Sequence, residues 1–275
     1  MYFWITMKGV TKVYRLFNTL SLDVAAGAVI STLLFAKIYA AVPSTASLIT
    51  LGLTVWIIYT TDRLLDVHGI KEEVASARHR FHQRHQATLK FWLILITMID
   101  GVMLFFIEAV VIKMGLILSL VVAIYILLRT RLYLFKELFI ALLYTAGVVL
   151  PVFPIHQISL QTFLPLVPFF FIALLNLIIF SRYERENDMH DNQPSIATIL
   201  NETSIEILLA WLFVITFSIT GVLVLSEAYF VSLVYIIMTL TLFLIYRYTG
   251  FFARNDFYRL AGDAVFLVPL IYILK

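Results

Sequence analysis

The sequence predicts an all-α integral membrane protein, folded as a bundle of nine membrane-spanning helices. Of its 275 residues, 62% are hydrophobic and only 13% are charged, whereas soluble domains are nearer half apolar and a quarter charged. The apolar residues fall into runs of the length that crosses a bilayer, about 20 residues each. Because the sequence contains no cysteine, disulfide frameworks, thiolate chemistry and cysteine-based metal sites are excluded.

Residues 1–18 are predicted to form an amphipathic helix at the membrane surface. Lys8, Lys12 and Arg15 are interspersed there with apolar residues such as Trp4 and Leu16, a composition typical of helices that lie in the membrane interface. The remaining residues, 19–275, are predicted to form a single membrane domain.

Nine apolar runs follow one another along this domain, and each predicts one membrane-spanning helix. They occupy residues 20–40, 45–66, 89–109, 111–128, 136–153, 162–182, 206–224, 228–247 and 257–274. Prolines near the ends of these runs are compatible with packed membrane helices, because neighbouring groups satisfy the freed backbone.

Basic residues are distributed unequally between the two ends of the predicted helices. With the N-terminus inside, only Lys37, Lys113 and Lys275 of the 20 Lys and Arg residues fall outside. Cytoplasmic segments of membrane proteins are enriched in Lys and Arg. The N-terminus and the connections 67–88, 129–135, 183–205 and 248–256 are therefore predicted to face the cytoplasm.

Two acidic clusters close the second and the sixth apolar runs, at the same predicted depth. Asp62 and Asp66 are four residues apart, as are Glu184 and Asp188, and this spacing places both acids of a cluster on one face of a helix. Carboxylates near hydrocarbon are costly and usually mark function. Mg²⁺ prefers oxygen ligands together with substrate phosphates. The four acids therefore predict a Mg²⁺ site for a lipid diphosphate, with helix-end acids paired to Arg63, Arg182 or Arg185 as the structural alternative.

Basic residues are expected around the same mouth. Arg78 and Arg80 lie in the histidine- and arginine-rich stretch 77–85, and Lys136 follows the inner connection that contains Arg129. A departing diphosphate needs such donors, because its charge has to be neutralised. The alternative for each of them is an anchor that contacts anionic headgroups.

Two further acids lie inside predicted spans. Asp100 falls in the middle of the third, where it is either a proton relay or a satisfied acid inside the bundle. Asp263 follows Arg259 by four residues, a spacing at which the two side chains pair on a helix.

Taken with these clusters, the chain resembles the UbiA-type superfamily of intramembrane prenyltransferases. The family's first motif reads N-D-x-x-D-x-x-x-D, and residues 58–66, Ile-Tyr-Thr-Thr-Asp-Arg-Leu-Leu-Asp, keep its last two acids. Its second reads D-x-E-x-D, which residues 184–188, Glu-Arg-Glu-Asn-Asp, resemble. The family's Tyr-x-x-x-Lys resembles Tyr125 to Arg129, and residues 136–147 look like its fifth helix.

This sequence departs from the family pattern at four positions. Ile58 replaces the leading Asn, which is a metal ligand in the family, and Tyr59 replaces the leading Asp. Glu184 stands in place of Asp and has a longer side chain. Arg129 stands in place of Lys, which keeps the charge but changes its shape.

The resemblance implies a cavity open to the cytoplasmic side and Mg²⁺-dependent transfer of an isoprenyl group from a polyprenyl diphosphate to a lipophilic acceptor, an aromatic or quinone-precursor compound. Asp62, Asp66, Glu184 and Asp188 would be the catalytic metal ligands. The substrate-binding residues would be Arg63, Arg78, Arg80, Tyr125, Arg129, Lys136 and Arg182. The protein is expected in a bacterial cytoplasmic membrane, with no nucleic-acid partner. A terpene cyclase of the same superfamily and a non-catalytic relative or transporter remain as alternatives.

Overall fold

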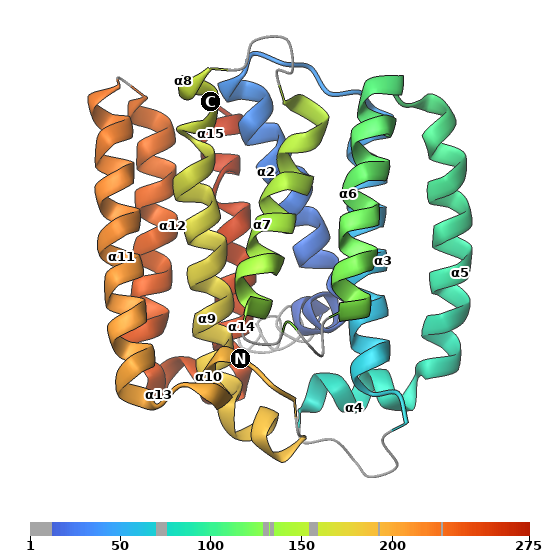
Figure 1. The fold of residues 1–275 in the computed structure, drawn as a ribbon, viewed down its shortest axis with the longest axis vertical. Coiled ribbons are helices and arrows are strands. Elements are labelled where there is room, and N and C mark those ends of the chain that lie inside the picture. Colours follow the sequence, from blue (N-terminus) through green and yellow to red (C-terminus); the bar gives the residue numbers. More distant parts are fainter. Residues whose placement is uncertain are drawn as a thin grey trace, which may run out of the picture.

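The computed structural model describes residues 13–69, 76–128, 132, 135–153, 159–191, 193–226 and 228–275, and every regular element within them is a helix (Figure 1). The long helices run side by side and alternate in direction along the chain (Figure 1). They are α2 (Leu22–Ile38), α3 (Thr45–Asp66), α5 (Gln86–Met103), α6 (Ala109–Leu128), α7 (Lys136–Val149), α9 (Leu166–His190), α11 (Glu202–Leu225) and α12 (Tyr229–Arg247).

Shorter helices complete the bundle and its ends. They are α4 (Ala77–Arg84), α8 (Leu160–Phe163), α10 (Ile196–Ile199), α13 (Thr249–Phe252), α14 (Phe257–Ala264) and α15 (Leu270–Ile273). Four short 3₁₀ segments adjoin them, at Leu104–Phe106 (η1), Leu150–Val152 (η3), Arg254–Asp256 (η4) and Val265–Leu267 (η5). Of the predicted surface segment 1–18, residues 1–12 lie outside the described part of the chain.

By length and apolar composition, six helical stretches of the described chain are able to cross a membrane. They are Thr45–Asp66, Gln86–Phe106, Ala109–Leu128, Leu160–His190, Glu202–Leu225 and Tyr229–Arg247. A seventh arises if Val13–Thr19 and Leu22–Ile38, which meet at 80°, are counted as one span. The other two predicted spans coincide with α7, which has 14 residues, and with the interrupted series α14–η5–α15. The predicted number of nine spans stays a prediction.

The core of the bundle is centred on α9. This helix packs against α7, α10, α11 and α12, and its Phe169, Ile172 and Leu175 are completely buried. In contrast, only 6% of the apolar stretches of α5 and α6 are buried, and Ile94 and Leu120 are more than 60% exposed. Apolar faces of this extent suit contact with lipid and not with water. The protein is therefore an integral membrane protein.

The first and last helices of the described chain close the bundle. Helix α2 packs against α14, η5 and α15. At one end of this contact, Asn18 Nδ2 donates hydrogen bonds to Asp23 Oδ2 at 2.5 Å and to Asp263 Oδ2 at 2.7 Å. All three side chains are buried, so a polar contact inside the protein joins residues at the two ends of the sequence.

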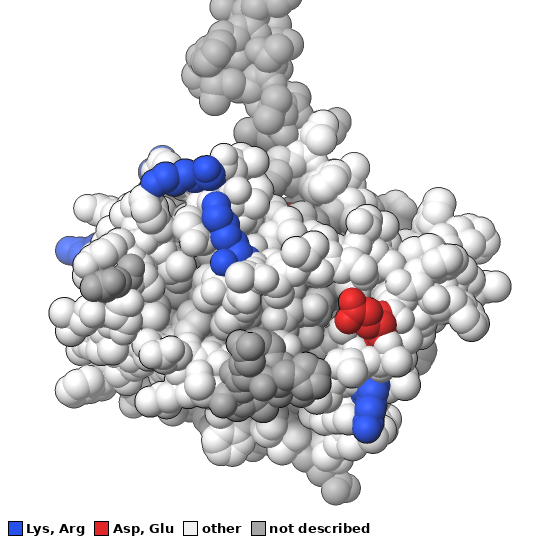
Figure 2. All heavy atoms as spheres, turned by 90° about the horizontal axis from the view of Figure 1, so that it is seen from above, with Lys and Arg blue, Asp and Glu red and all other residues white. Residues whose placement is uncertain are grey.

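Charged side chains are unevenly distributed along the bundle axis. The face at the top of Figure 1, where α2 ends and α3 begins, shows few of them (Figure 2). Helices α3 and α9 both end at the opposite face (Figure 1), where each carries its predicted acidic cluster. This asymmetry matches the charge distribution that the sequence predicted, and it places both clusters at one end of the bundle.

We expect Gly262→Ala to lower the thermal stability of the protein. A Cβ atom on Gly262 would lie 2.5 Å from Phe180 and 2.6 Å from Asn176 Oδ1 of α9, and both neighbours are buried. Overpacking of this kind costs typically about 1–3 kcal/mol. The melting temperature in detergent measures the effect. Gly221→Ala on α11 is the control, since a Cβ there meets nothing within 4 Å, and an equal loss in both variants would contradict the prediction.

Candidate functional site

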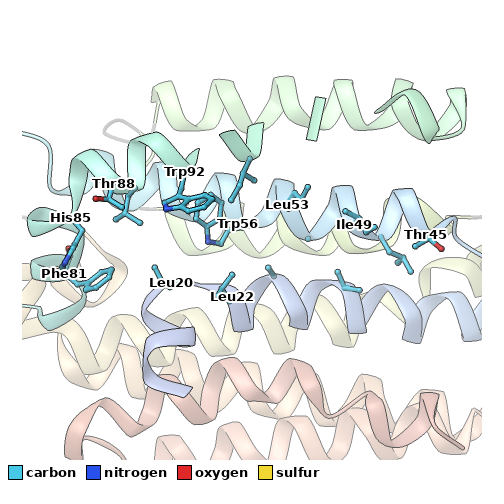
Figure 3. Close-up of a pocket in the computed structure, with 16 residues that line it drawn as sticks. Leu20, Leu22, Thr45, Ile49, Leu53, Trp56, Phe81, His85, Thr88 and Trp92 are labelled. Atoms are coloured by element: carbon cyan, nitrogen blue, oxygen red, sulfur yellow. The ribbon is translucent and has the colours of Figure 1, made fainter. Parts of the chain in front are cut away.

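Two large cavities differ in the chemistry of their walls. One is a groove of about 640 Å³ between α2, α3, α4 and α5, lined by side chains such as Leu53, Trp56 and Trp92. Figure 3 shows His85 and Thr88 at one end of the groove and Thr45 at the other. Because its walls are almost entirely apolar, this groove suits a hydrocarbon chain and offers little for chemistry.

The other cavity has about the same volume, about 620 Å³, but contains most of the charged residues that the sequence singled out. Helices α2, α3, α4, α5, α6, α7, α9 and α14 contribute its lining. All four predicted acids are among the lining residues, Asp62 and Asp66 from the last turns of α3, and Glu184 and Asp188 from the last turns of α9. The spacing of four residues within each cluster places both of its acids on one helix face. The ends of the two helices are joined where Gln193 Nε2 donates to the Asp66 carbonyl oxygen at 3.3 Å.

Four basic residues line the same cavity. Arg63, Arg78 and Lys136 were predicted from the sequence, and Arg259 of α14 joins them. Arg63 is only 5% exposed, and its Nη1 donates to the Thr19 carbonyl oxygen at 3.3 Å. Its guanidinium also lies over the Tyr59 ring, 5.7 Å from the centroid. The fixed positions of such buried cations favour recognition of an anion.

Glu184 already has two partners within the protein. It forms an ion pair with Arg259, and Tyr258 Oη donates a hydrogen bond to its Oε1 at 2.8 Å. Helix α14 is therefore attached to the second acidic cluster. Asp263, four residues later on the same helix, was the partner that the sequence predicted for Arg259; the two charges do attract each other, and Asp263 also accepts a hydrogen bond from Asn18.

His79 is the one neutral imidazole among these lining residues. Burial, followed by the nearby charges of Arg78, Arg259 and Arg63, lowers the pKa of His79 to about 2. At neutral pH the ring therefore carries no charge, although Arg78 beside it does. His79 can donate or accept a hydrogen bond in the cavity, but it does not add to the positive charge that faces a bound anion.

The charge balance of the cavity bears on whether a metal fits. Its lining contains seven carboxyl side chains and four Lys or Arg side chains. A bound diphosphate would add further negative charge to the cavity, and the nearby carboxylates would repel it. Within the described residues, no group of three or more His, Cys, Asp or Glu residues could hold a metal by itself. Mg²⁺, however, commonly binds one or two carboxylates together with substrate phosphates. The donor set fits a cation that arrives with a diphosphate.

No family model matches this chain, and no curated protein sequence matches it. Among solved structures, that of digeranylgeranylglyceryl phosphate synthase, a UbiA-type prenyltransferase, matches 96% of this chain and 99% of its own. The two share 12% sequence identity, with a TM-score of 0.55. The chain shares the fold of this synthase. At this identity the likeness establishes the fold, and the activity has to be argued from the residues of the cavity.

Not all residues that the sequence assigned to the site line the charged cavity. Tyr125 does, with 8% of its surface exposed, and so does Ile58 in the position of the family's asparagine. Arg80 is described but does not belong to the lining, and Arg129 lies outside the described residues. Arg182 is directed to α11, where it pairs with Glu202 at 2.7 Å and Glu206 at 3.0 Å.

Several lining residues were missed because no local pattern marks them. Glu137 is 6% exposed and accepts a hydrogen bond from the Ile196 backbone at its Oε1. Arg259 reaches the site only because α14 folds back onto α9. The available signal was that each is a charged residue within a predicted apolar span, which in membrane proteins usually indicates function.

The position of Arg182 predicts that it contributes little to ligand binding. We expect Arg182→Ala to leave the affinity for a prenyl diphosphate analogue unchanged within about twofold and to lower stability by about 1 kcal/mol or less, as is usual for ion pairs with exposed carboxylates. Titration of the analogue against the purified variant measures the affinity. Arg63→Ala, which removes a lining cation, is the comparison. A larger loss of affinity in Arg182→Ala than in Arg63→Ala would contradict this assignment.

Proposed function

We propose that the protein transfers an isoprenyl group from an isoprenyl diphosphate to a lipophilic acceptor in a Mg²⁺-dependent reaction. The observation that supports this most is the division of a single cavity into two parts. One end carries two acidic clusters and four basic residues, and the remaining walls are mainly apolar. An isoprenyl diphosphate has the same division, with an anionic head and a hydrocarbon tail.

The head group is proposed to bind at the charged end. Mg²⁺ bound by Asp62, Asp66, Glu184 and Asp188 would offset the charge that develops on the leaving diphosphate. Arg63, Arg78 and Lys136 would donate hydrogen bonds to its oxygens. Of the four acids, Glu184 has the additional task of holding Arg259, so we assign the larger share of metal binding to Asp62, Asp66 and Asp188.

The chemistry follows from the arrangement of the walls. The bond between the allylic carbon and the diphosphate oxygen breaks, and the oxygen keeps the electron pair. The acceptor then forms a bond to that carbon and loses a proton. Apolar walls exclude water, which would otherwise capture the allylic cation, and the aromatic faces of Tyr59 and Tyr125 in the lining stabilise positive charge. We propose an aromatic or quinone-precursor compound as acceptor.

The location of the reaction is part of the same proposal. The charged end would face the cytoplasm of a bacterial cytoplasmic membrane, where water-soluble Mg²⁺ and diphosphate are available. The concentration of Lys and Arg at that end of the bundle supports this orientation. The isoprenyl tail would then extend from the charged end towards the middle of the bilayer.

Release of diphosphate from geranyl, farnesyl and geranylgeranyl diphosphates tests the proposal, with and without Mg²⁺. We expect release that EDTA abolishes and Mg²⁺ restores. Analysis of the organic products separates the alternatives, because a cyclic hydrocarbon formed without acceptor would indicate a terpene cyclase. If no diphosphate is released, and if a thiolodiphosphate analogue with Mg²⁺ does not raise the melting temperature, the protein is a non-catalytic relative.

A further inference from the structure

One carboxyl group lies in the apolar part of the cavity and has no task in the reaction described above. Asp100, which the sequence placed in the middle of a span, lies in the last turn of α5 and is a lining residue, together with apolar neighbours such as Leu104 and Ile107. Thr54 Oγ1 of α3 donates a hydrogen bond to its Oδ2 at 2.9 Å. Its other oxygen, Oδ1, is buried and has no hydrogen-bond partner in the described part of the chain.

The position of Asp100 separates it from the acidic clusters. Thr54 precedes Asp62 by eight residues on α3, and at 1.5 Å per residue the two are about 12 Å apart along the helix. A diphosphate bound at Asp62 and Asp66 therefore does not reach Asp100. Thr50, one helical turn before Thr54, interacts with the same carboxyl group, but its buried Oγ1 forms no hydrogen bond of good geometry with it or with any other described group.

Two polar groups that lack a well-formed hydrogen bond therefore face the cavity from neighbouring helices. Asp100 offers an acceptor, and Thr50 offers a hydroxyl that can donate. Buried polar groups in proteins are nearly always hydrogen-bonded, and an exception calls for an explanation. A charged residue within a membrane helix usually belongs to a functional site. Both groups lie on the wall of the same cavity, so a molecule inside it can contact them.

We propose that Asp100, Thr50 and Thr54 form a binding site for the hydroxyl group of a lipophilic compound, the acceptor of the proposed reaction. A hydroxyl satisfies both unpaired groups at once, because it donates to Asp100 Oδ1 and accepts from Thr50 Oγ1. An ammonium group cannot, since it has no acceptor. This inference rests on the proposed function for the identity of the ligand as acceptor, while the site itself rests on the geometry of α3 and α5.

The site would fix the orientation of the acceptor in the cavity. With its hydroxyl held at the depth of Asp100, the rest of the molecule extends towards the charged end, where the allylic carbon forms. Holding reactants in this way lowers the entropic part of the barrier. The site also selects hydroxylated compounds, because an analogue without the hydroxyl leaves Asp100 and Thr50 unpaired.

A naphthol and its methyl ether test the site, since they share a skeleton and only the naphthol donates a hydrogen bond. Their affinities for the whole protein in lipid nanodiscs are measured by calorimetry, with empty nanodiscs as the blank. We expect the parent to bind the naphthol about tenfold more tightly than the ether, as is usual for a hydrogen bond to a charged group. In Asp100→Ala this preference should fall to about one.

Thr97→Val is the matched control. Thr97 also lines the cavity from α5, but its Oγ1 donates to the Leu93 carbonyl oxygen of its own helix at 2.7 Å. The variant should keep the preference, and Thr50→Val should lose part of it. Equal affinities for the two compounds in the parent would overturn the inference. So would a preference that survives in Asp100→Ala, or the absence of measurable binding by either compound.

A second measurement separates this inference from the proposed function. In Asp100→Ala, a farnesyl thiolodiphosphate analogue with Mg²⁺ should raise the melting temperature as much as in the parent, which also shows that the variant is folded. If the analogue has no effect on the parent but the naphthol preference is present, the hydroxyl site stands and the transferase proposal fails. If the analogue stabilises the parent and the preference is absent, the hydroxyl site fails alone.

Discussion

Replacement of Asp62 or Asp188 by Asn is expected to lower turnover by more than about 100-fold. Residues that only hydrogen-bond to a metal ligand already contribute about 10- to 100-fold to metal affinity or activity, and loss of a ligand itself should cost more. Each change keeps the size of the side chain and removes one negative charge from a cavity that has to hold Mg²⁺ beside a diphosphate. Both residues line the charged end of the cavity. The Mg²⁺ dependence of diphosphate release by each variant measures the effect.

Glu206→Gln provides the control for these two variants. Glu206 lies at the same end of the bundle as Asp188, but it pairs with Arg182 outside the cavity and its side chain is 51% exposed. Its neutralisation should leave turnover and the Mg²⁺ requirement unchanged. If Asp62→Asn keeps the parent's rate and Mg²⁺ requirement, the α3 cluster is not a metal site, and its acids serve the structure of the helix end.

Arg259→Met is expected to produce the largest loss of stability, about 3–5 kcal/mol, as is usual when one member of a buried ion pair is removed. Arg259 is 8% exposed and pairs with Glu184, whose side chain is 17% exposed. Without Arg259, the carboxylate of Glu184 stays in the cavity wall without its counter-ion. Thermal unfolding in detergent measures the loss. The apolar methionine keeps the contact with the Phe180 ring, over which the guanidinium lies at 5.4 Å.

A double variant and a surface variant make this prediction specific. Adding Glu184→Gln to Arg259→Met should recover part of the stability, because the remaining charge is removed as well. Arg185→Met should cost at most about 1 kcal/mol, since Arg185 pairs at 3.3 Å with Glu202, which is half exposed. If the double variant is less stable than Arg259→Met alone, the uncompensated charge of Glu184 is not the cause of the loss of stability.

The parts of the fold that the sequence predicted are those that depend on composition alone. Long apolar runs predicted α3, α6, α11 and α12 with ends within a few residues of those observed, whereas α9 continues beyond the predicted end at residue 182 to His190. The run from residue 257 to 274 is also continuous in hydropathy, yet the structure divides it into α14, η5 and α15. Pro269 directly precedes α15 and provides no backbone donor, and packing of η5 against α2 holds the interrupted backbone in place. Hydropathy does not report such breaks.

A similar distinction holds for the cavity. Asp62, Asp66, Glu184 and Asp188 could be grouped in advance because each pair repeats with the period of a helix and ends an apolar run. The contact of Arg259 with Glu184 could not, because it depends on how α14 packs against α9. The pairing of Arg182 with Glu202 and Glu206 could not be predicted for a related reason: a helix end has several faces, and the sequence does not say which of them this residue occupies.

The contact of Asn18 with Asp23 and Asp263 has a consequence for biosynthesis. Ribosomes deliver the N-terminal part of a chain first, so Asp23 enters the membrane long before Asp263, 240 positions later. A shorter delay, of 75 positions, separates Glu184 from its counter-ion Arg259. We infer that nascent chains ending ahead of Phe257 carry Glu184 without its partner Arg259, and Asn18 and Asp23 without their contact to Asp263. In pulse-chase experiments such truncated chains should be degraded faster than the parent, and equal lifetimes would contradict this. Closure of the bundle would thereby let the cell distinguish finished molecules from unfinished ones.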